Sequence, residues 1–466
     1  MNNEISAVLE SLPENHILWA DAKNQYSSVD IIKISNLINS KLELSGAVAL
    51  FVNNPLYLAT LITAFEGVLS RVALIHYTRN LNISEFSDLV KKAKAKNILT
   101  DDTESITDLN LDDVIIYDIN NWFDINSIRE EIQPVNVIEP KYDTEWIIPT
   151  SGTTDTPKLV VHTFSSLTRS TKRNIDKGKE LRWGMLYQLS RFAGLQVYFQ
   201  SLTSGSKLIF IDLNNIEVAI DSLIKESCNA LSATPTMYRK LLMSKSIASL
   251  NLVQITLGGE IVDQKILNSL SYLFPKARIN HIYASTEAGV GFSVSDKLAG
   301  FPIEYTFQKI KGVDIKVSSE ELLHLRSDSM TKNIINSDSS KLTDFEGYIN
   351  TGDRVQKVDN RYIFLGRENG SINVGGNKVF PEEVENVLLE LPFVEFAHVK
   401  GKSNPLVGQL VCAEVVITSS ENQNYNDLNL KIVNHCKERL DLFKVPAVIK
   451  FVDKLKINKS GKIERK

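Results

Sequence analysis

Short apolar runs alternate along the chain with stretches in which apolar residues recur at helical spacing. Residues 47–52 (AVALFV) predict a buried strand, residues 56–70 an apolar-periodic helix, and residues 72–76 (VALIH) a second strand. A strand, a helix and a further strand in this order are typical of a parallel sheet. The first half of the chain is therefore predicted to have an α/β fold.

A second unit of the same kind follows. Residues 252–257 (LVQITL) predict a strand, residues 263–274 a helix, and residues 278–283 (RINHIY) the next strand. A right-handed crossover makes such strands parallel, adjacent or nearly so, and brings both carboxyl ends to one edge of the sheet. Polar loops follow both strands, at 258–260 (GGE) and 284–287 (ASTE). Since such sheets bind ligands at this edge, we expect a ligand site there.

From about residue 311 the pattern changes to shorter strands of alternating polarity, and Asp359-Asn360 fits a hairpin turn between the last two. A polar, glycine-bracketed segment at 366–371 then precedes a helix at 381–390. We predict a large N-terminal domain of residues 1–366, with parallel-rich sheets and a β-rich section, and a small mobile α+β C-terminal domain of residues 367–466. The strands expected in the β-rich section are 314–317, 322–326, 354–358 and 362–365.

Composition places the chain among folded proteins. Its 466 residues are 43% apolar and 23% charged, which fits two or three domains. The 52 Lys and Arg against 56 Asp and Glu give a net charge of −4, without the basic excess that binds phosphate backbones. Nucleic acid is not an expected partner.

Cysteine usage and the N-terminus indicate the compartment. The 3 cysteines, Cys228, Cys412 and Cys436, are far apart and cannot all pair, which fits a reducing compartment. Residues 1–20 carry glutamates where a signal peptide needs basic residues. The apolar run at 56–65 is about half of the roughly 20 residues that a membrane-spanning helix needs. We expect a cytoplasmic protein without a membrane segment.

The most informative segment is residues 146–163 (WIIPTSGTTDTPKLVVHT), in which two β-rich runs flank a loop at 150–158. Hydroxyl side chains, a glycine and Lys158 gather within this loop, and all of these groups favour binding of oxyanions. A phosphate-binding loop is one interpretation, and a solvated, Ser/Thr-rich hairpin turn is the other. The Gly-x4-Gly-Lys-Ser/Thr form of the common P-loop is absent.

Five motifs in a fixed order carry a family resemblance. After the loop at 150–158 come Tyr-Ala-Ser-Thr-Glu at 283–287, Asn-Thr-Gly-Asp at 350–353, Gly-Arg at 366–367 and Asn-Lys-Ser-Gly-Lys at 458–462. From about residue 15 to its end, the chain resembles the acyl-adenylate-forming superfamily of acyl- and aryl-CoA synthetases, nonribosomal adenylation domains and luciferase. One motif alone would be weak, but five in sequence are specific.

The resemblance implies an AMP-forming acid–thiol ligase. Such an enzyme activates a small-molecule carboxylic acid with ATP and Mg²⁺, releases pyrophosphate, and passes the acyl group to a thiol of CoA or of carrier-protein phosphopantetheine. Because the chain ends at Lys466, we expect any acyl carrier to be a separate protein.

The resemblance also assigns roles at the nucleotide. Glu287 would bind Mg²⁺, and Thr286 would lie at the α-phosphate, with Ser285 beside it in the motif. Tyr283 and the loop of Gly258, Gly259 and Glu260 would flank the adenine. The residues implied to hold the β- and γ-phosphates are those of the first loop: Thr150, Ser151, Gly152, Thr153, Thr154 and Lys158.

Three further roles concern the ribose and the C-terminal domain. Asp353 would accept both ribose hydroxyls, supported by Arg367. Lys462 would bridge the attacking carboxylate and the α-phosphate, although a tail lysine by itself is normally solvated. Asn369 would be the hinge about which the C-terminal domain swings between half-reactions, with Gly375-Gly376 presented for the second one.

Some positions depart from the family pattern. Asp155 stands where the phosphate loop usually has glycine, and Asn373, Lys456 and Asn458 also differ. In the acid pocket, where many relatives have a histidine, the chain reads Ser-Arg-Phe-Ala-Gly-Leu at 190–195, and no Asp lies between residues 187 and 200. An α-amino acid substrate is therefore less expected.

Arg191, Phe192 and Gly194 are the predicted acid-pocket residues. Arg191 would either pair with a second acidic or polar group of the substrate or lie on the surface over Phe192. For the whole protein, three alternatives stay open: a ligase for a carrier protein or an amine, a catalytically silent adenylate-binding homologue, and an unrelated α/β binding module.

Overall fold

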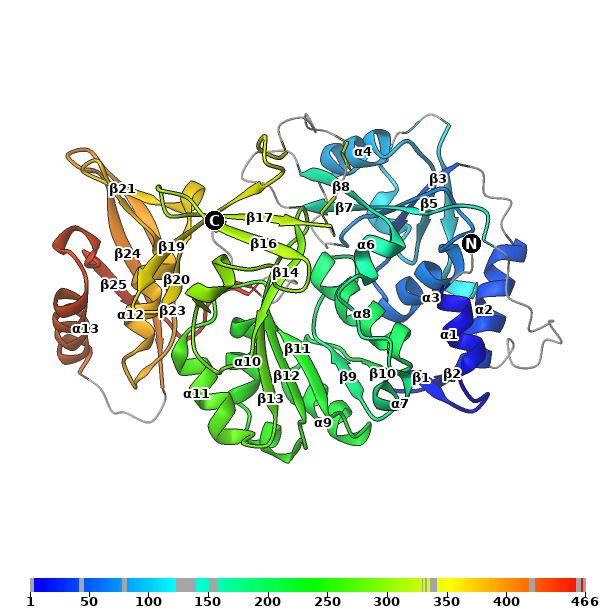
Figure 1. The fold of residues 1–466 in the computed structure, drawn as a ribbon, viewed down its shortest axis with the longest axis horizontal. Coiled ribbons are helices and arrows are strands. Elements are labelled where there is room, and N and C mark those ends of the chain that lie inside the picture. The colour runs from blue at the N-terminus through cyan, green and yellow to red at the C-terminus, as the bar shows by residue number, and fades with distance from the viewer. Residues whose placement is uncertain are drawn as a thin grey trace.

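The computed structural model describes most of the chain and contains two parallel-rich sheets and two antiparallel-rich sheets (Figure 1). The described residues are 4–41, 46–77, 82–109, 111, 113–122, 140–150, 157–328, 330–331, 333–335, 342–418, 424–457 and 462–463. The sheets are called A to D below.

Sheet A has eight described strands, and its six central strands are parallel. The two edge strands run antiparallel to their neighbours. Their order is β14 (Gly289–Val294), β13 (Arg278–Ser285), β12 (Gln254–Gly258), β11 (Ala230–Ala233), β9 (Arg182–Met185), β10 (Lys207–Phe210), β1 (Ile17–Ala20) and β2 (Gln25–Ser27).

Sheet B has seven described strands, of which β7, β4, β3, β5 and β6 are parallel. The strands β8 and β18 are added antiparallel at one edge. Their order is β18 (Asn333–Ile334), β8 (Lys158–His162), β7 (Glu145–Thr150), β4 (Arg71–Leu74), β3 (Ala47–Phe51), β5 (Ala95–Thr100) and β6 (Ile115–Asp118).

Helices bury both faces of these sheets. Along β3, Val48 and Leu50 join a core with α3 (Pro55–Phe65) and α8 (Phe192–Ser204), whereas Phe51 joins another with α4 (Ile83–Lys92). Successive strand residues point to opposite faces, so strands buried on both faces read as continuous apolar runs.

The other helices follow the same layers. α1 (Glu4–Ser11) and α2 (Ser28–Lys41) join the core between the sheets, together with short α6 (Phe164–Thr168) and neighbouring α7 (Ile175–Gly178). The outer face of sheet A is covered by α9 (Ile216–Lys225), α10 (Pro235–Leu242) and α11 (Gln264–Leu273).

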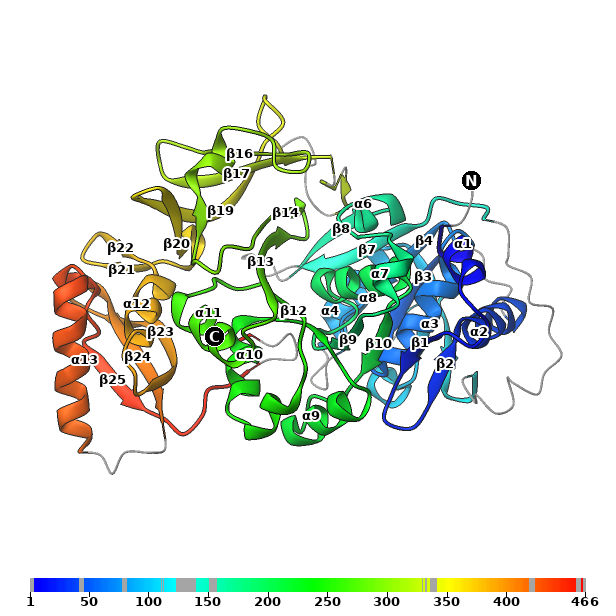
Figure 2. The same ribbon diagram turned by 60° about the horizontal axis from the view of Figure 1, so that its bottom comes forward.

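Sheet C is antiparallel and lies beside the β14 edge of sheet A (Figure 2). Its core joins Phe292 of β14 to residues of sheet C such as Phe301 and Val355. The strand order is β15 (Phe301–Pro302), β20 (Arg361–Arg367), β19 (Ile349–Val358), β17 (Leu322–Ser327) and β16 (Val313–Val317).

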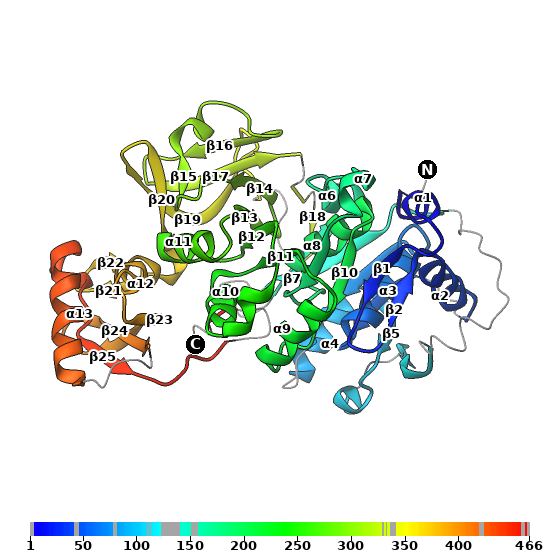
Figure 3. The same ribbon diagram turned by 90° about the horizontal axis from the view of Figure 1, so that it is seen from below.

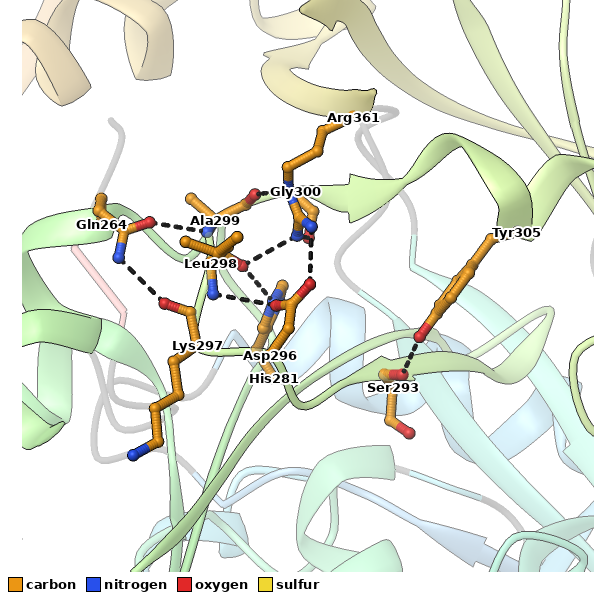
Figure 4. Close-up of polar contacts among 10 residues, drawn as sticks. All are labelled: Gln264, His281, Ser293, Asp296, Lys297, Leu298, Ala299, Gly300, Tyr305 and Arg361. Carbon is orange, nitrogen blue, oxygen red and sulfur yellow. Dashed lines mark hydrogen bonds and ion pairs between the residues drawn. The ribbon is translucent and has the colours of Figure 1, made fainter. Parts of the chain in front are cut away.

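Arg361 ties the loop between sheets A and C to sheet C (Figure 4). Its Nη1 pairs with Asp296 at 2.7 Å, and Nη2 donates to the carbonyl of Leu298 at 3.2 Å. The same carbonyl lies 3.0 Å from Nε2 of His281, and Gln264 donates to the carbonyl of residue 297 at 3.0 Å. This loop is therefore held by side chains from both sheets.

Sheet D follows β20 and carries its own core with α12 (Pro381–Leu389) and α13 (Tyr425–Arg439). Nζ of Lys265, on α11, donates to the carbonyls of Leu391 and Val394 at 2.9 and 2.8 Å. After the last strand, the chain returns toward α10 (Figure 3). The strands are β22 (Asn377–Val379), β21 (Ile372–Val374), β24 (Gly408–Ile417), β23 (Val394–Asn404) and β25 (Val448–Phe451).

The α/β fold class with parallel-rich sheets and a β-rich section is confirmed. The strands predicted at 47–52 and 72–76 are the parallel neighbours β3 and β4, and those at 252–257 and 278–283 are β12 and β13. The division at residues 366 and 367 stays a prediction. No helix among the described residues has the length and apolar character needed to cross a bilayer.

Two predicted boundaries differ most from the structure. The helix expected at 56–70 ends at Phe65, because Glu66 adopts an extended ψ of 122° and Gly67 has a φ of +79°. The strand expected at 354–358 begins earlier, at Ile349, so Asp353 lies inside β19 and not at its start.

Candidate active site

The predicted polar edge of sheet A is formed by the carboxyl ends of its parallel strands. Gly258 ends β12, Ser285 ends β13, and Thr234 follows β11 as the N-cap of α10. Tyr187, which follows β9, donates its hydroxyl hydrogen to the Gly258 carbonyl at 3.1 Å. Several of the predicted nucleotide residues thus share one edge.

The tail lysine reaches this edge. Gly259 has a φ of +82°, and a Cβ placed on it would lie 3.5 Å from Cε and 3.7 Å from Nζ of Lys462. Glycine is suited to this position because it tolerates positive φ. The structure therefore brings Lys462 next to the loop at 258–260.

Charged side chains from three parts of the chain surround Lys462. Burial lowers the pKa of this lysine, and the nearby Arg191 and Arg367 act in the same direction. Glu260 and Asp353 oppose this shift as the nearby carboxylates. The predicted site residues thus converge electrostatically at the tail ammonium.

Asp353 is hydrogen-bonded to two other predicted site residues, and its bond with Tyr283, which was expected beside the adenine, was not predicted. Arg367 lies opposite it in the register of β19 and β20 and donates from Nε to Oδ1 at 3.1 Å. The Tyr283 hydroxyl donates to Oδ2, and the Tyr283 ring stacks with Phe292 at 5.3 Å and Phe364 at 5.2 Å between centroids. Burial and Asp353 together raise the pKa of Tyr283, so its hydroxyl stays protonated.

The backbone of Thr286 and Glu287 is held by His162 of sheet B and by Thr331, which precedes β18. His162 donates from Nε2 to the Thr286 carbonyl at 2.7 Å, and Thr331 donates its amide to the Glu287 carbonyl at 2.9 Å. Burial lowers the pKa of His162 to about 4, so the ring is neutral at pH 7. The amide of Ala288 donates to Oγ of Ser285 at 3.0 Å, which closes the turn.

The first loop is described only at its ends. Thr150 and Lys158 are paired across the antiparallel hairpin of β7 and β8, as the two flanking β-rich runs predict. Residues 151–156 lie outside the described residues. The roles of Ser151, Gly152, Thr153 and Thr154, and the position of Asp155, therefore stay predictions.

The predicted acid-pocket residues lie at the start of helix α8. Arg191 is mostly buried, and its Nε donates to Oε1 of Gln188 at 3.0 Å. Phe192 is buried with its ring 5.5 Å from that of His162. A Cβ on Gly194 would lie 2.3 Å from the Gln188 carbonyl oxygen, so this glycine permits close chain packing. Contact of these three residues with substrate stays a prediction.

His76 lies beside the predicted acid-pocket residue Arg191 and was missed by sequence reasoning. Its Nε2 donates to the Pro149 carbonyl at 2.7 Å, so its Nδ1 is the acceptor for the Ser190 hydroxyl at 3.0 Å. Burial and the nearby Arg191 lower the pKa of His76 to about 3. The signal that could have found it is its position just after β4, at the carboxyl edge of a parallel sheet.

The predicted hinge lies between sheets C and D. Asn369 is the middle residue of a short 3-10 helix, Glu368–Gly370, that joins β20 to β21. Gly375 and Gly376 follow β21 with φ values of +59° and +88°, which fits the turn into β22. Whether the chain pivots at Asn369 stays a prediction.

Comparison with known proteins gives the family. The family model described as AMP-binding enzyme matches residues 43–325, and that of the AMP-binding enzyme C-terminal domain matches residues 383–462. A 2-succinylbenzoate–CoA ligase of Bacillus licheniformis is 27% identical over 350 residues, 71% of each chain. A D-alanine–D-alanyl carrier protein ligase of Staphylococcus aureus is 26% identical over 350 residues, 70% of each chain.

The fold agrees with this assignment. The structure of o-succinylbenzoate CoA synthetase from Bacillus subtilis, in complex with its acyl-adenylate intermediate, superposes with a TM-score of 0.74 at 20% identity. The match covers 99% of this chain and 97% of that one. With its fold, its motifs and both family models in agreement, the chain belongs to the AMP-binding enzyme family.

Proposed function

We propose that this protein is an AMP-forming acid–thiol ligase. It activates a carboxylic acid with ATP to an acyl-adenylate, releases pyrophosphate, and transfers the acyl group to a thiol. The observation that carries the proposal is the contact of the Lys462 side chain with Gly259, beside Glu260, at the edge of sheet A where β12 ends. This contact supports the activity from the site itself, because family membership alone does not fix an activity.

Adenylation requires two anions to meet. The carboxylate oxygen attacks the α-phosphorus of ATP, the new acyl–phosphate bond forms, and the bond to pyrophosphate breaks. Lys462 offsets charge on both groups as they approach, which is electrostatic stabilisation of the transition state. Asp353, oriented by Tyr283 and Arg367, accepts hydrogen bonds from the ribose and so fixes the nucleotide against the tail lysine.

Glu287 fits the proposed Mg²⁺ site. Mg²⁺ prefers oxygen ligands and is commonly held by one or two carboxylates together with substrate phosphates. Among the described residues there is no group of three or more acidic, His or Cys side chains that could hold a metal alone. Glu287 would therefore share the ion with the phosphates of ATP, where the ion neutralises triphosphate charge.

The acyl acceptor is a thiol of CoA or of a carrier protein. CoA is favoured by the 2-succinylbenzoate–CoA ligase relative, and a phosphopantetheine carrier by the D-alanyl carrier protein ligase relative. Incubation with ATP, the acid and either CoA or an acyl carrier protein separates the two.

The test of the activity is acid-dependent exchange of labelled pyrophosphate into ATP. We expect exchange that requires ATP, the acid and Mg²⁺ and that needs no thiol. Absence of exchange across aliphatic, aromatic and hydroxylated acids would contradict the proposal and favour a silent adenylate-binding homologue.

Replacing Asn369 with proline tests the proposed hinge. In the present arrangement Lys462 lies at the nucleotide edge, which corresponds to adenylation. Proline fixes φ near −65°, so Asn369→Pro is expected to slow thiol transfer by about 10-fold or more while adenylation changes less. Single-turnover rates of each half-reaction measure this, with Asn369→Ala as the control for side-chain loss. Wild-type rates in both half-reactions would contradict the hinge.

A further inference from the structure

Arg191 is a mostly buried arginine that has no acidic partner among the described residues. Its one side-chain hydrogen bond there runs from Nε to Gln188, a neutral amide. Burying a guanidinium without an anion is costly, and burial indeed lowers the pKa of Arg191. Other arginines in the described chain do have carboxylate partners: Arg71 with Glu145, Arg239 with Asp263, Arg361 with Asp296 and Arg367 with Asp353.

The guanidinium is held in a fixed orientation. Gln188 donates from Nε2 to the Tyr77 carbonyl at 3.1 Å, which directs its Oε1 toward Nε of Arg191. Gly194 lets the Gln188 backbone pack directly on the start of α8. Nε is already used, and no described residue bonds to either Nη group, so both can make the paired hydrogen bonds that arginine makes with a carboxylate.

The described titratable groups whose pKa Arg191 affects, His76 and Lys462, are neutral and positive. His76, whose Nε2 donates to the Pro149 carbonyl, has its pKa lowered to about 3 and so carries no charge near pH 7. Lys462 is close enough for Arg191 to lower the lysine pKa. A substrate at this position would therefore meet an arginine whose charge is not compensated by any described residue.

The reacting carboxylate is a poor counter-ion for such a fixed charge. Once it attacks phosphorus it becomes an acyl phosphate and loses its own negative charge, and transfer to the thiol makes it a neutral thioester. A second carboxylate on the same molecule keeps its charge through both half-reactions. It would keep Arg191 paired from substrate binding to product release.

We propose that Arg191 binds a second carboxylate of the acid substrate, so that the enzyme acts on dicarboxylic acids. This inference rests on the proposed ligase function and names its substrate class. The start of α8 supports the same proposal. Arg191 is the N-cap of this helix and makes no side-chain capping bond. The positive end of the helix dipole lies there and favours a bound anion.

The experiment compares each diacid with its own half-ester. Pyrophosphate exchange is measured with succinate, glutarate, adipate and phthalate, with their monomethyl esters, and with butyrate and benzoate. We expect at least one diacid to exceed its monomethyl ester by about 10-fold or more in kcat/KM. Arg191→Gln should then lower kcat/KM for that diacid by about 100-fold, mainly through KM, the scale for losing charge-assisted hydrogen bonds.

The controls separate this role from others. Arg191→Gln should lower kcat/KM for the diacid by at least about 10-fold more than for its half-ester, leave KM for ATP within about 2-fold, and keep the wild-type thermal midpoint. Arg191→Lys, which keeps the charge but loses the paired geometry, should recover only part of the diacid rate. Arg278→Gln removes an exposed arginine at the start of β13 and should change nothing.

Three results would overturn the inference. Exchange with half-esters or monoacids that equals that of every diacid would refute it while leaving the ligase function intact. An equal loss with diacid and half-ester in Arg191→Gln would place Arg191 at the reacting carboxylate or the α-phosphate instead. Absence of exchange with all of these acids and with the broad panel would refute the ligase function itself.

Discussion

Lys462→Ala is expected to lower the rate of acid-dependent adenylation by about 100- to 1000-fold, the scale for removing one preorganised charge donor from a transition state. Lys462 lies against Gly259 with Glu260 and Asp353 nearby, so its ammonium would be held at the junction of acid and α-phosphate. ATP binding should persist, because the remaining nucleotide contacts come from other residues. Single-turnover formation of acyl-adenylate measures the loss.

The other half-reaction supplies the control. Thiol transfer from supplied acyl-adenylate should be much less affected by Lys462→Ala, because no new bond to phosphorus forms in that step. Lys454→Ala removes an exposed lysine from the same tail and should leave both half-reactions unchanged. An equal loss in both half-reactions would contradict the role assigned to Lys462.

The stability of the fold is expected to fall steeply as the pH drops below about 6.5. Burial lowers the pKa of His76 to about 3 and of His162 and His281 to about 4 in the folded state. The unfolded chain, with histidine pKa values near 6.5, binds protons in this range that the folded chain does not. Each histidine therefore lowers the free energy of unfolding by about 1.4 kcal/mol per pH unit as the pH falls from about 6 to 5.

Glu66 acts in the opposite direction. Burial raises its pKa to about 7 although Trp146 donates a hydrogen bond to it. The folded state thus keeps a proton that the unfolded state releases above about 4.5, so the contribution of Glu66 is lost as the pH rises. The three histidines outweigh this one carboxyl group, and the net slope should be roughly 3 kcal/mol per pH unit between pH 6 and 5.

Urea unfolding at pH 7.5, 6 and 5 measures this slope. His281 lies in β13 and donates from Nε2 to the carbonyl of Leu298, so His281→Gln should reduce the slope by about 1.4 kcal/mol per pH unit without changing exchange activity at pH 7.5. Unfolding free energies that do not change between pH 6 and 5, or an unchanged slope in His281→Gln, would contradict the assignment.

Much of the fold could be predicted because its strands are buried on both faces. The apolar runs of β3 and β4 stand out for this reason, and so do those of β12 and β13. Element ends were less predictable. The end of α3 depends on Glu66 leaving the helix toward Trp146, a contact between residues 80 positions apart that no local pattern contains.

The site was partly predictable because its motifs carry recognisable chemistry at the ends of strands. Sequence order predicted roles for Asp353, Arg367 and Lys462, and the structure pairs Asp353 with Arg367 and places Lys462 against Gly259. The side chains that position these motifs were not predictable. His162 and Thr331 contact the backbone of residues 286–287 from distant segments, and a lone histidine or threonine carries no signal of such a contact.

The contact of Lys265 with the carbonyls of Leu391 and Val394 has a consequence for motion. It attaches sheet D to α11. The tail that follows sheet D places Lys462 against Gly259. A rotation of sheet D together with its tail would break the Lys265 contact and withdraw Lys462 from Gly259 in one movement. If the chain pivots at Asn369, leaving this arrangement would break both contacts together, and the strength of a contact outside the nucleotide site would help to set how long this arrangement lasts.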